Sequence, residues 1–125
     1  MQREEAQAGP RRLQVTLPPN VDAPAAARRA LRSLPLGDRE VDVLLLASEL
    51  ITNAVVHADA AMSRPIELSA ACEGGRTHVE VRCHDDGAIA AELSVGYGLR
   101  LLAGATERWG VERDGMTLVW FELGQ

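Results

Sequence analysis

The chain has 125 residues and a mass of 13.5 kDa, which is the size of one compact domain. Its apolar fraction of 46% and charged fraction of 25% are typical of soluble globular proteins, so the composition indicates neither a fibre nor a disordered chain. A formal net charge of −5 and an aromatic content of only 3% argue against direct nucleic-acid binding, which uses basic surfaces and aromatic stacking platforms.

All 13 of the Lys-plus-Arg residues are arginine, and this excludes chemistry that depends on lysine. The chain has neither a Walker A lysine nor a Schiff-base lysine. Its longest purely apolar run, Val43–Ala47, is far too short to span a bilayer, and the polar segment Met1–Glu5 has no signal-peptide character. We therefore expect a cytoplasmic protein without a membrane segment.

The start of the chain predicts a disordered tail followed by a strand. Residues 1–10 are polar and end in Gly-Pro, which is typical of a mobile terminus. From residue 12 to residue 17 apolar side chains alternate with polar ones, which is the pattern of a half-buried strand, and Pro18 ends it. We therefore place the folded domain at residues 11–125.

Two helices are expected next. Residues 23–34 form an alanine-rich segment that Asp22 can cap. Residues 38–58 predict the longest helix, with Asp38 as its cap and further acidic residues in its first turns, where the helix dipole favours them. Apolar side chains surround most of this helix, so we expect it to be buried. They include Val41, Val43, Leu44, Leu45, Leu50, Ile51, Ala54 and Val55.

Two segments with alternating apolar residues, 66–72 and 77–83, flank a Gly-Gly pair and predict a β-hairpin with a two-residue turn. This turn pairs Cys72 with Thr77 and places the apolar residues of both strands on one face. Cys72 and Cys83 then lie at opposite ends of the hairpin, about 20 Å apart at about 3.3 Å per residue. They are too far apart to form a disulfide with each other, and we expect both to be reduced core thiols.

A second hairpin is expected near the end of the chain. An Asp-Gly turn at residues 114–115 predicts that Val111 pairs with Leu118 and that Trp109 pairs with Trp120.

A short helix is expected at residues 97–104, between the two hairpins. The order of the elements is then strand, helix, helix, hairpin, helix, hairpin. This order favours an α+β fold, a two-layer sandwich in which helices cover one face of a mixed or antiparallel sheet.

Three polar residues form a stripe on the longest predicted helix. Glu49, Asn53 and His57 fall within an arc of about 80° at about 100° per residue. A carboxylate, an amide and an imidazole on an otherwise apolar helix need polar surroundings. The stripe therefore faces either a polar cavity or a solvated edge of the helix, and the stripe alone does not decide between them.

Two further segments carry residues that suit a nucleotide. Asp85 follows a predicted strand and can accept a hydrogen bond from an exocyclic amine, while Gly87 permits close approach of the backbone. Gly96 and Gly98 precede a predicted helix, whose N–H groups can bind phosphate. Taken alone, the first segment is more often a simple Asp-Gly turn, and a simple loop-to-helix junction explains the second.

In their order along the chain, the three segments resemble the N, G1 and G2 boxes of the GHKL (Bergerat-fold) ATPases. The matching motifs are Glu-Leu-x-x-Asn-Ala-x-x-His at 49–57, Asp-x-Gly at 85–87 and Gly-x-Gly-Leu at 96–99. The surrounding sequence is similar to a small actinobacterial branch related to anti-sigma-factor serine kinases. The resemblance covers residues 12–123 and implies the Bergerat ATP-binding fold.

The resemblance implies a role for each residue of the first box, with ATP and Mg²⁺ as cofactors. Asn53 would be the ligand of a Mg²⁺ ion that bridges the ATP phosphates, and hard oxygen ligation suits that ion. Glu49 would be the general base that activates an attacking hydroxyl. His57 occupies the basic position of the box, where it would pair with a phosphate or support the cavity wall.

The resemblance also implies nucleotide-binding roles for the other two boxes. Asp85 would accept the adenine amine, and Gly87 would allow the backbone to approach closely. Gly96 and Gly98 would cradle phosphate, and Leu99 completes their motif.

The sequence departs from the family pattern at two places. Ala88 and Ile89 stand where the first glycine box expects a second glycine, and the segment 88–95 is short and has no basic residue. In the last strand, a gapless match puts Leu118 where the family often has a hydroxyl residue near the adenine. Thr117 is then one position off, on the other side of the pleat.

Two hypotheses for the function follow. In the first, the chain binds ATP and Mg²⁺, phosphorylates a Ser or Thr of a partner resembling an anti-sigma-factor antagonist, and sequesters a sigma factor. In the second, the same fold is a degenerate partner-binding module with little or no nucleotide binding or catalysis. A homodimer formed through the first strand is compatible with either hypothesis.

Two further alternatives have less support in the sequence. A two-component histidine kinase needs a long dimerisation helix with a phosphoacceptor histidine, which the chain lacks. A metal site built from His78, His84 and Asp86 would join two histidines that lie six residues apart on a predicted solvent-facing side.

Overall fold

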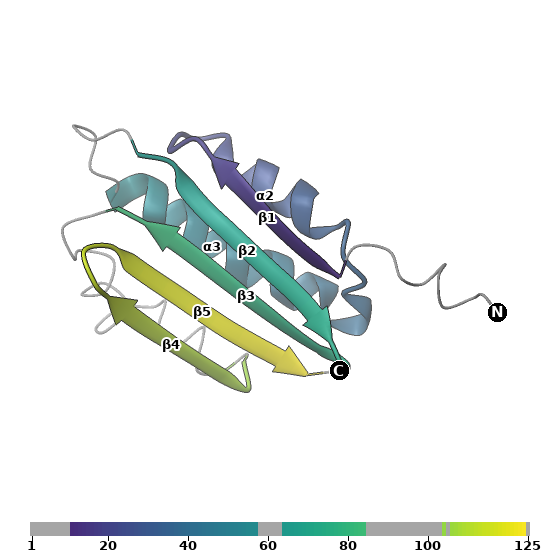
Figure 1. Cartoon of the computed structure of the whole chain (residues 1–125). Coiled ribbons are helices and arrows are strands. Elements are labelled where there is room, and N and C mark those ends of the chain that lie inside the picture. Colours follow the sequence, from purple (N-terminus) through teal and green to yellow (C-terminus); the bar gives the residue numbers. More distant parts are fainter. Residues whose placement is uncertain (1–10, 58–63, 85–103, 105, 125) are drawn as a thin grey trace.

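One antiparallel sheet and two α-helices make up the described part of the chain (Figure 1). The computed structural model describes residues 11–57, 64–84, 104 and 106–124. The elements are β1 (Arg12–Leu17), α2 (Ala23–Leu31), the 3-10 helix η1 (Gly37–Arg39), α3 (Glu40–His57), β2 (Ile66–Glu73), β3 (Arg76–Cys83), β4 (Arg108–Arg113) and β5 (Thr117–Gly124).

The strands lie in the order β1-β2-β3-β5-β4, and every neighbouring pair is antiparallel. α2 contacts β1, and α3 contacts β3 and α2, so both helices cover the same face of the sheet (Figure 1). This arrangement confirms the predicted α+β class with two layers, and the described strands form no parallel pair. The predicted tail at 1–10 and, apart from Gly104, the predicted helix at 97–104 lie outside the described residues.

The first hairpin has the predicted register. Cys72 pairs with Thr77, and alternate side chains of both strands are buried toward the helices. Gly74 and Gly75 have φ angles of 60° and 77°, which is the left-handed region that a type I′ turn requires. Cys72 and Cys83 are both buried and both free, as expected.

The second hairpin is shifted by one residue from the prediction. Val111 pairs with Val119 and not with Leu118. The turn holds three residues, 114–116, instead of two, and its middle residue, Gly115, has a φ of 76°. Turns of both lengths favour glycine in the left-handed region, so the Asp-Gly signal does not distinguish them.

The shift exchanges the two faces of the last strand. Trp109 pairs with Phe121 and not, as predicted, with Trp120. Phe121 and Thr117 are fully buried on the side of the helices. Trp120 is half-buried on the outer face, where its ring stacks on His78.

α2 is shorter than predicted and ends at Leu31 instead of residue 34. Asp22 holds the N-cap position, but its side chain makes no capping hydrogen bond. Its N–H instead donates to the side-chain oxygen of Asn20 at 2.9 Å. Ala23, Ala27 and Leu31 recur every four residues and form the buried face of the helix.

α3 begins two residues later than predicted, because Asp38 lies within η1 and does not cap the longer helix. Val41 and Leu45 are 75% and 50% exposed, so the expectation of a helix buried on all sides is wrong for these residues. α2 and the sheet cover only part of the circumference of α3. None of the described helices combines the length and the apolar character needed to cross a bilayer.

The outer face of the sheet is tightly packed where Trp120 crosses Gly110 of β4. A Cβ atom at Gly110 would lie 2.5 Å from the indole nitrogen of Trp120 and 2.8 Å from two of its carbons. The stacking on His78, with ring centroids 5.6 Å apart, restrains the indole. We therefore expect Gly110→Ala to lower the free energy of unfolding by about 1–3 kcal/mol, measured by urea denaturation.

Gly104→Ala is the matched control, because nothing lies within 4 Å of a Cβ atom added there. It should leave the stability unchanged or raise it slightly. Equal losses of stability in the two variants would contradict the prediction.

Candidate functional site

Glu49 and Asn53 lie on one flank of α3, and the other flank packs on α2. The contact with α2 includes a hydrogen bond from the Arg28 guanidinium to the Ser48 hydroxyl at 3.0 Å. Around the helix axis, Glu49 lies about 100° and Asn53 about 140° from Ser48, so both project away from α2. Both side chains are half-buried.

The flank that carries these two residues is turned toward the β5 side of the sheet, because α2 covers β1 and α3 covers β3. On that side Thr117 begins β5, pairs with Cys83 at the end of β3 and is fully buried on the face that the helices cover. The gapless match had put Leu118 on this face. The correct length of the second turn is the signal that would have identified Thr117 as the inward hydroxyl residue.

The end of β3 and the end of α3 lie at the same end of the sheet (Figure 1). A short segment leads from His57, the last residue of α3, to the start of β2. The start of β2 in turn pairs with the end of β3, where Glu67 lies opposite Arg82. The central strand β3 therefore ends near the C-terminal end of α3. Asp85 follows two residues after the last residue of β3, Cys83.

The predicted site is described only in part. Glu49 and Asn53 are brought to one flank of a buried helix, and the backbone of His57 ends that helix. The side chain of His57 lies outside the described part of the structure, as do the glycine-box residues Asp85, Gly87, Gly96, Gly98 and Leu99.

The chemistry of Glu49 and Asn53 suits a hard cation. Carboxylate and amide oxygens are ligands that Mg²⁺ accepts, and this ion usually keeps several waters and binds substrate phosphates in addition. Neither side chain is hydrogen-bonded to another described residue. Among the described residues, no group of three His, Cys, Asp or Glu side chains could hold a metal ion by itself.

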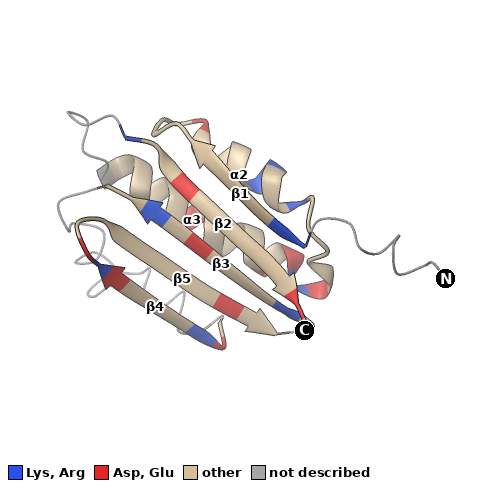
Figure 2. Ribbon diagram, viewed as in Figure 1, with Lys and Arg blue, Asp and Glu red and all other residues tan. Residues whose placement is uncertain are grey.

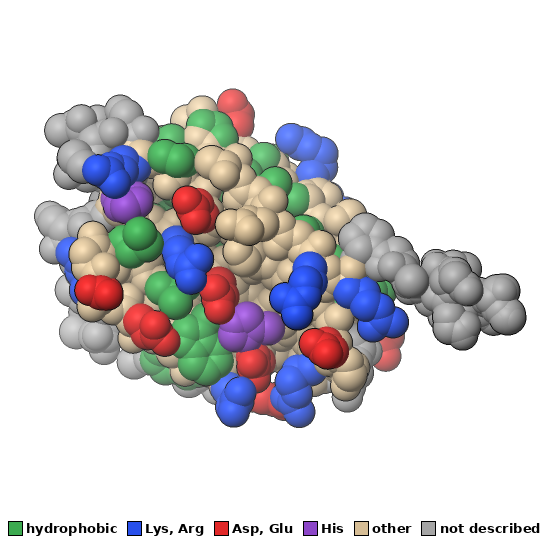
Figure 3. All heavy atoms as spheres, in the orientation of Figure 1, with side chains coloured by type: hydrophobic (Ala, Val, Ile, Leu, Met, Phe, Trp, Pro, Cys, Tyr) green, Lys and Arg blue, Asp and Glu red, His purple; other side chains and the backbone are tan. Residues whose placement is uncertain are grey.

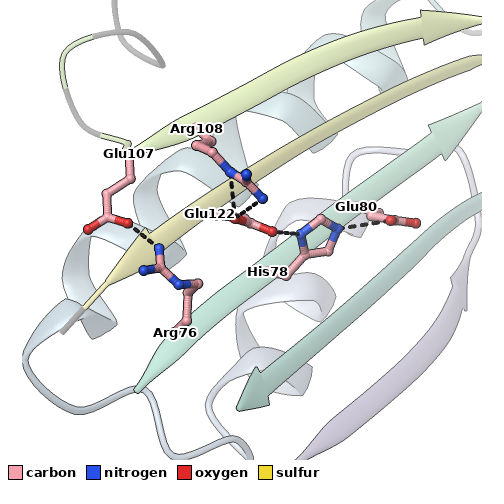
Figure 4. A network of polar contacts seen from close by, with 6 residues as sticks. All are labelled: Arg76, His78, Glu80, Glu107, Arg108 and Glu122. Carbon is pink, nitrogen blue, oxygen red and sulfur yellow. Dashed lines mark hydrogen bonds and ion pairs between the residues drawn. The ribbon is translucent and has the colours of Figure 1, made fainter. Parts of the chain in front are cut away.

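The outer face of the sheet carries interspersed acidic and basic side chains, several of them in one network (Figures 2, 3 and 4). His78 contacts Glu122 through Nδ1 at 2.8 Å and Glu80 through Nε2 at 2.9 Å. Arg108 donates to Glu122 at 3.0 and 2.9 Å, and Arg82 lies 3.6 Å from Glu80.

The predicted metal site requires His78, and this network already engages that residue. Both ring nitrogens of His78 already face carboxylates. His84 lies six residues further along the chain, about 20 Å away at about 3.3 Å per residue, and Asp86 is outside the described residues. The described residues therefore give no support to a metal site of this composition.

A hollow of about 400 Å³ opens on the outer face over β1, β2 and β3. Its small residues Ser69 and Ala71 lie between the longer side chains of Arg12 on β1 and His78 on β3. The helices lie on the other side of the sheet, so this hollow is separate from the flank that carries Glu49.

No protein-family model matches the chain, and a search of curated proteins found no match either.

The carboxyl group of Glu122 is stabilised in its charged form by the outer-face network. Burial raises the pKa of Glu122. Hydrogen bonds from His78 and Arg108, together with the positive charges of these two residues, lower the pKa by more than burial raises it. The pKa of Glu122 therefore lies below the ordinary value of 4.5. A carboxyl group whose pKa is lower in the folded state stabilises the fold fully above pH 4.5. This stabilisation is lost as the pH falls through the lower, folded-state pKa.

We expect Glu122→Gln to lower the free energy of unfolding by about 1–3 kcal/mol at pH 7, because charge-assisted hydrogen bonds are lost. The difference from the wild type should shrink as the pH falls below 4.5. Urea denaturation at a series of pH values measures both quantities. Glu73→Gln is the control, since the side chain of Glu73 is exposed and has no hydrogen bond or ion pair with the described residues. A difference for Glu122→Gln that stays constant down to pH 3 would show that the network does not stabilise the carboxylate.

Proposed function

We propose that the chain is an ATP- and Mg²⁺-binding regulatory protein with the Bergerat fold, of the GHKL class. In this proposal it transfers phosphate to a serine or threonine of a partner protein. The resemblance implies that the partner is similar to an anti-sigma-factor antagonist and that a sigma factor is the protein sequestered. The observation that carries the proposal is the half-buried position of Glu49 and Asn53 on the flank of α3 that faces away from α2.

The arrangement of the strands supports the proposal. The central strand β3 ends near the end of α3 that carries Asn53, and the chain leads from there to Asp85. Thr117 lies beside Cys83 at that end of β3 and faces the helical side of the sheet. A nucleotide bound between α3 and β5 would therefore have an oxygen ligand for its cation, a carboxylate and a hydroxyl residue beside it.

The proposed chemistry uses Glu49 and Asn53 directly. ATP would supply the phosphoryl group, and Mg²⁺ would neutralise charge on its phosphates. The Asn53 amide oxygen would hold the cation, and the Glu49 carboxylate would accept the proton of the attacking hydroxyl. The hydroxyl oxygen bonds to the γ-phosphorus as the bond to the bridging oxygen of the leaving ADP breaks.

The glycine-box residues complete the proposed site. In this proposal Asp85 would accept a hydrogen bond from the adenine amine, and Gly87 would leave room for the base. Gly96 and Gly98, followed by Leu99, would present backbone N–H groups to the phosphates.

The second candidate function is a partner-binding module that keeps the fold without the nucleotide. Ala88 and Ile89, where the box expects a second glycine, favour it. So do the exposed apolar residues Val41 and Leu45 on α3, because a surface of this kind suits a protein partner.

Titration calorimetry with ATP and Mg²⁺ distinguishes the two candidates. We expect the wild type to bind ATP in a Mg²⁺-dependent manner and Asn53→Ala to bind at least about tenfold more weakly, because a cation ligand is lost. Asp42→Asn is the control, since Asp42 lies on the same flank of α3 but pairs with Arg39 at 3.2 Å near the start of the helix. Absence of binding at millimolar nucleotide would leave the partner-binding module as the function.

Glu49→Gln separates binding from chemistry. We expect this variant to bind ATP like the wild type and to form ADP at least about 100-fold more slowly, because the general base is lost. The measurement is release of ADP from ATP at saturating Mg²⁺, where water takes the phosphoryl group in place of the partner's hydroxyl, with Asp42→Asn again as the control. An unchanged rate in Glu49→Gln would remove Glu49 from the proposed mechanism.

A further inference from the structure

The hollow on the outer face of the sheet has a floor of small residues between two polar walls. Two rows of paired residues that cross β1, β2 and β3 build it. The rows are Arg12, Ala71 and His78, and next to it Gln14, Ser69 and Glu80. Because the middle residue of each row is small, β2 forms the floor, and the longer side chains of β1 and β3 form the walls.

The size of the hollow suits one small molecule. Neighbouring strands lie about 4.8 Å apart, so the two walls begin about 10 Å apart, and the two rows are about 7 Å apart along the strands. The volume of the hollow is about 400 Å³. Ligand sites usually measure about 300–1,000 Å³, so this hollow would take a ligand at the small end of that range.

The wall on β3 is held in place by its own contacts. The ring of His78 contacts Glu122 at 2.8 Å and Glu80 at 2.9 Å through its two nitrogens (Figure 4). Glu80 also lies 3.6 Å from Arg82. The indole of Trp120 stacks on the His78 ring and is not among the described residues that line the hollow, so it supports the ring from the far side. The imidazole is therefore a fixed, planar border of the hollow.

The wall on β1 carries hydrogen-bond donors. Arg12 and Gln14 are exposed, and their side chains and the Ser69 hydroxyl have no hydrogen bond or ion pair with another described residue. All three groups can donate hydrogen bonds. The planar guanidinium group in addition presents two parallel N–H groups that match the two oxygens of a carboxylate. This wall therefore suits a negatively charged acceptor.

We propose that the hollow is a binding site for a small planar carboxylate, of the class of the aromatic acids. The carboxylate lies against Arg12, with Gln14 and Ser69 as further donors. The planar apolar part lies over Ala71 beside the imidazole of His78, where ring-to-ring contact is favourable. The site lies on the opposite side of the sheet from the proposed nucleotide site, so the inference goes beyond the proposed function.

The charges around the hollow favour a monoanion over a phosphate ester. Among the described lining residues, Arg12 is the only arginine or lysine, and Glu80 on the opposite wall is an acid. A phosphate monoester carries a charge of about −1.5 to −2 at pH 7, which one arginine does not balance. A carboxylate carries one charge, which Arg12 balances. A cationic ligand is disfavoured, since Glu80 already contacts His78 and Arg82.

The test uses the full chain, labelled with ¹⁵N, and benzoate as the probe. We expect benzoate to shift the amide NMR signals of residues 12–14, 69–71 and 78–80 in a saturable manner. Benzamide has the same shape without the charge and should bind at least about tenfold more weakly, because the charge-assisted hydrogen bonds are lost. Inorganic phosphate should also bind at least about tenfold more weakly, because its second charge is not balanced.

Protein variants locate the site. Arg12→Gln removes the charge, and Ala71→Leu fills the floor of the hollow, so each should weaken benzoate binding at least about tenfold. Both side chains lie on the outer face, so the thermal unfolding midpoint should change little. Arg29→Gln is the matched control, because Arg29 is exposed and has no ion pair with another described residue, but lies on α2 on the other side of the sheet. It should bind benzoate like the wild type.

Three outcomes would overturn the proposal. The first is the absence of saturable shifts at millimolar benzoate, and the second is equal binding by the wild type, Arg12→Gln and Ala71→Leu. The third is binding of phosphate as tightly as benzoate, which would indicate an adventitious ion only. Failure of ATP binding would overturn the proposed function alone and leave the benzoate measurements unaffected.

Discussion

Burial of one arc of α3 against the sheet and α2 is the constraint on which the rest of the structure depends. This arc consists of Val43, Leu44, Leu46, Ala47, Leu50, Ile51 and Ala54, all of which are buried. Because the angles between side chains on a helix are constant, burying this arc also sets the direction of every other residue. Glu49 and Asn53 are thereby held at the border of the sheet, and Val41, Leu45 and Val56 face solvent.

The two faces of the sheet satisfy different requirements. The helical side buries an apolar core that includes Phe121 and Leu123, while the outer side is polar and has no helix over it in the described structure. The network of His78 and Glu122 with their charged neighbours links β3, β5 and β4 across that outer side (Figure 4). Its charges are largely satisfied within the chain, and the proposed nucleotide site lies on the helical side.

Local patterns predicted the fold class and most strands, because the elements are short and their neighbours in the sheet are often neighbours in the sequence. The first hairpin followed directly from alternation around a Gly-Gly turn. The second failed because an Asp-Gly pair is compatible with turns of two and of three residues, and one residue reverses the face of every side chain in a strand. For the same reason Thr117, and not Leu118, turned out to be the buried residue. Asp22 and Asp38 have the composition of helix caps, but neither side chain acts as one.

The sequence by itself determined that Glu49 and Asn53 share one side of a helix, since that follows from the period of 3.6 residues alone. It also determined the hairpin that carries both cysteines and the order of the described elements. Only the tertiary structure decided which side of α3 stays uncovered, because α3 is apolar nearly all round and its periodicity does not distinguish a side that meets the sheet from one that meets solvent. That choice depends on where α2 and β3 come to lie. These are long-range contacts, which no local pattern along the chain records.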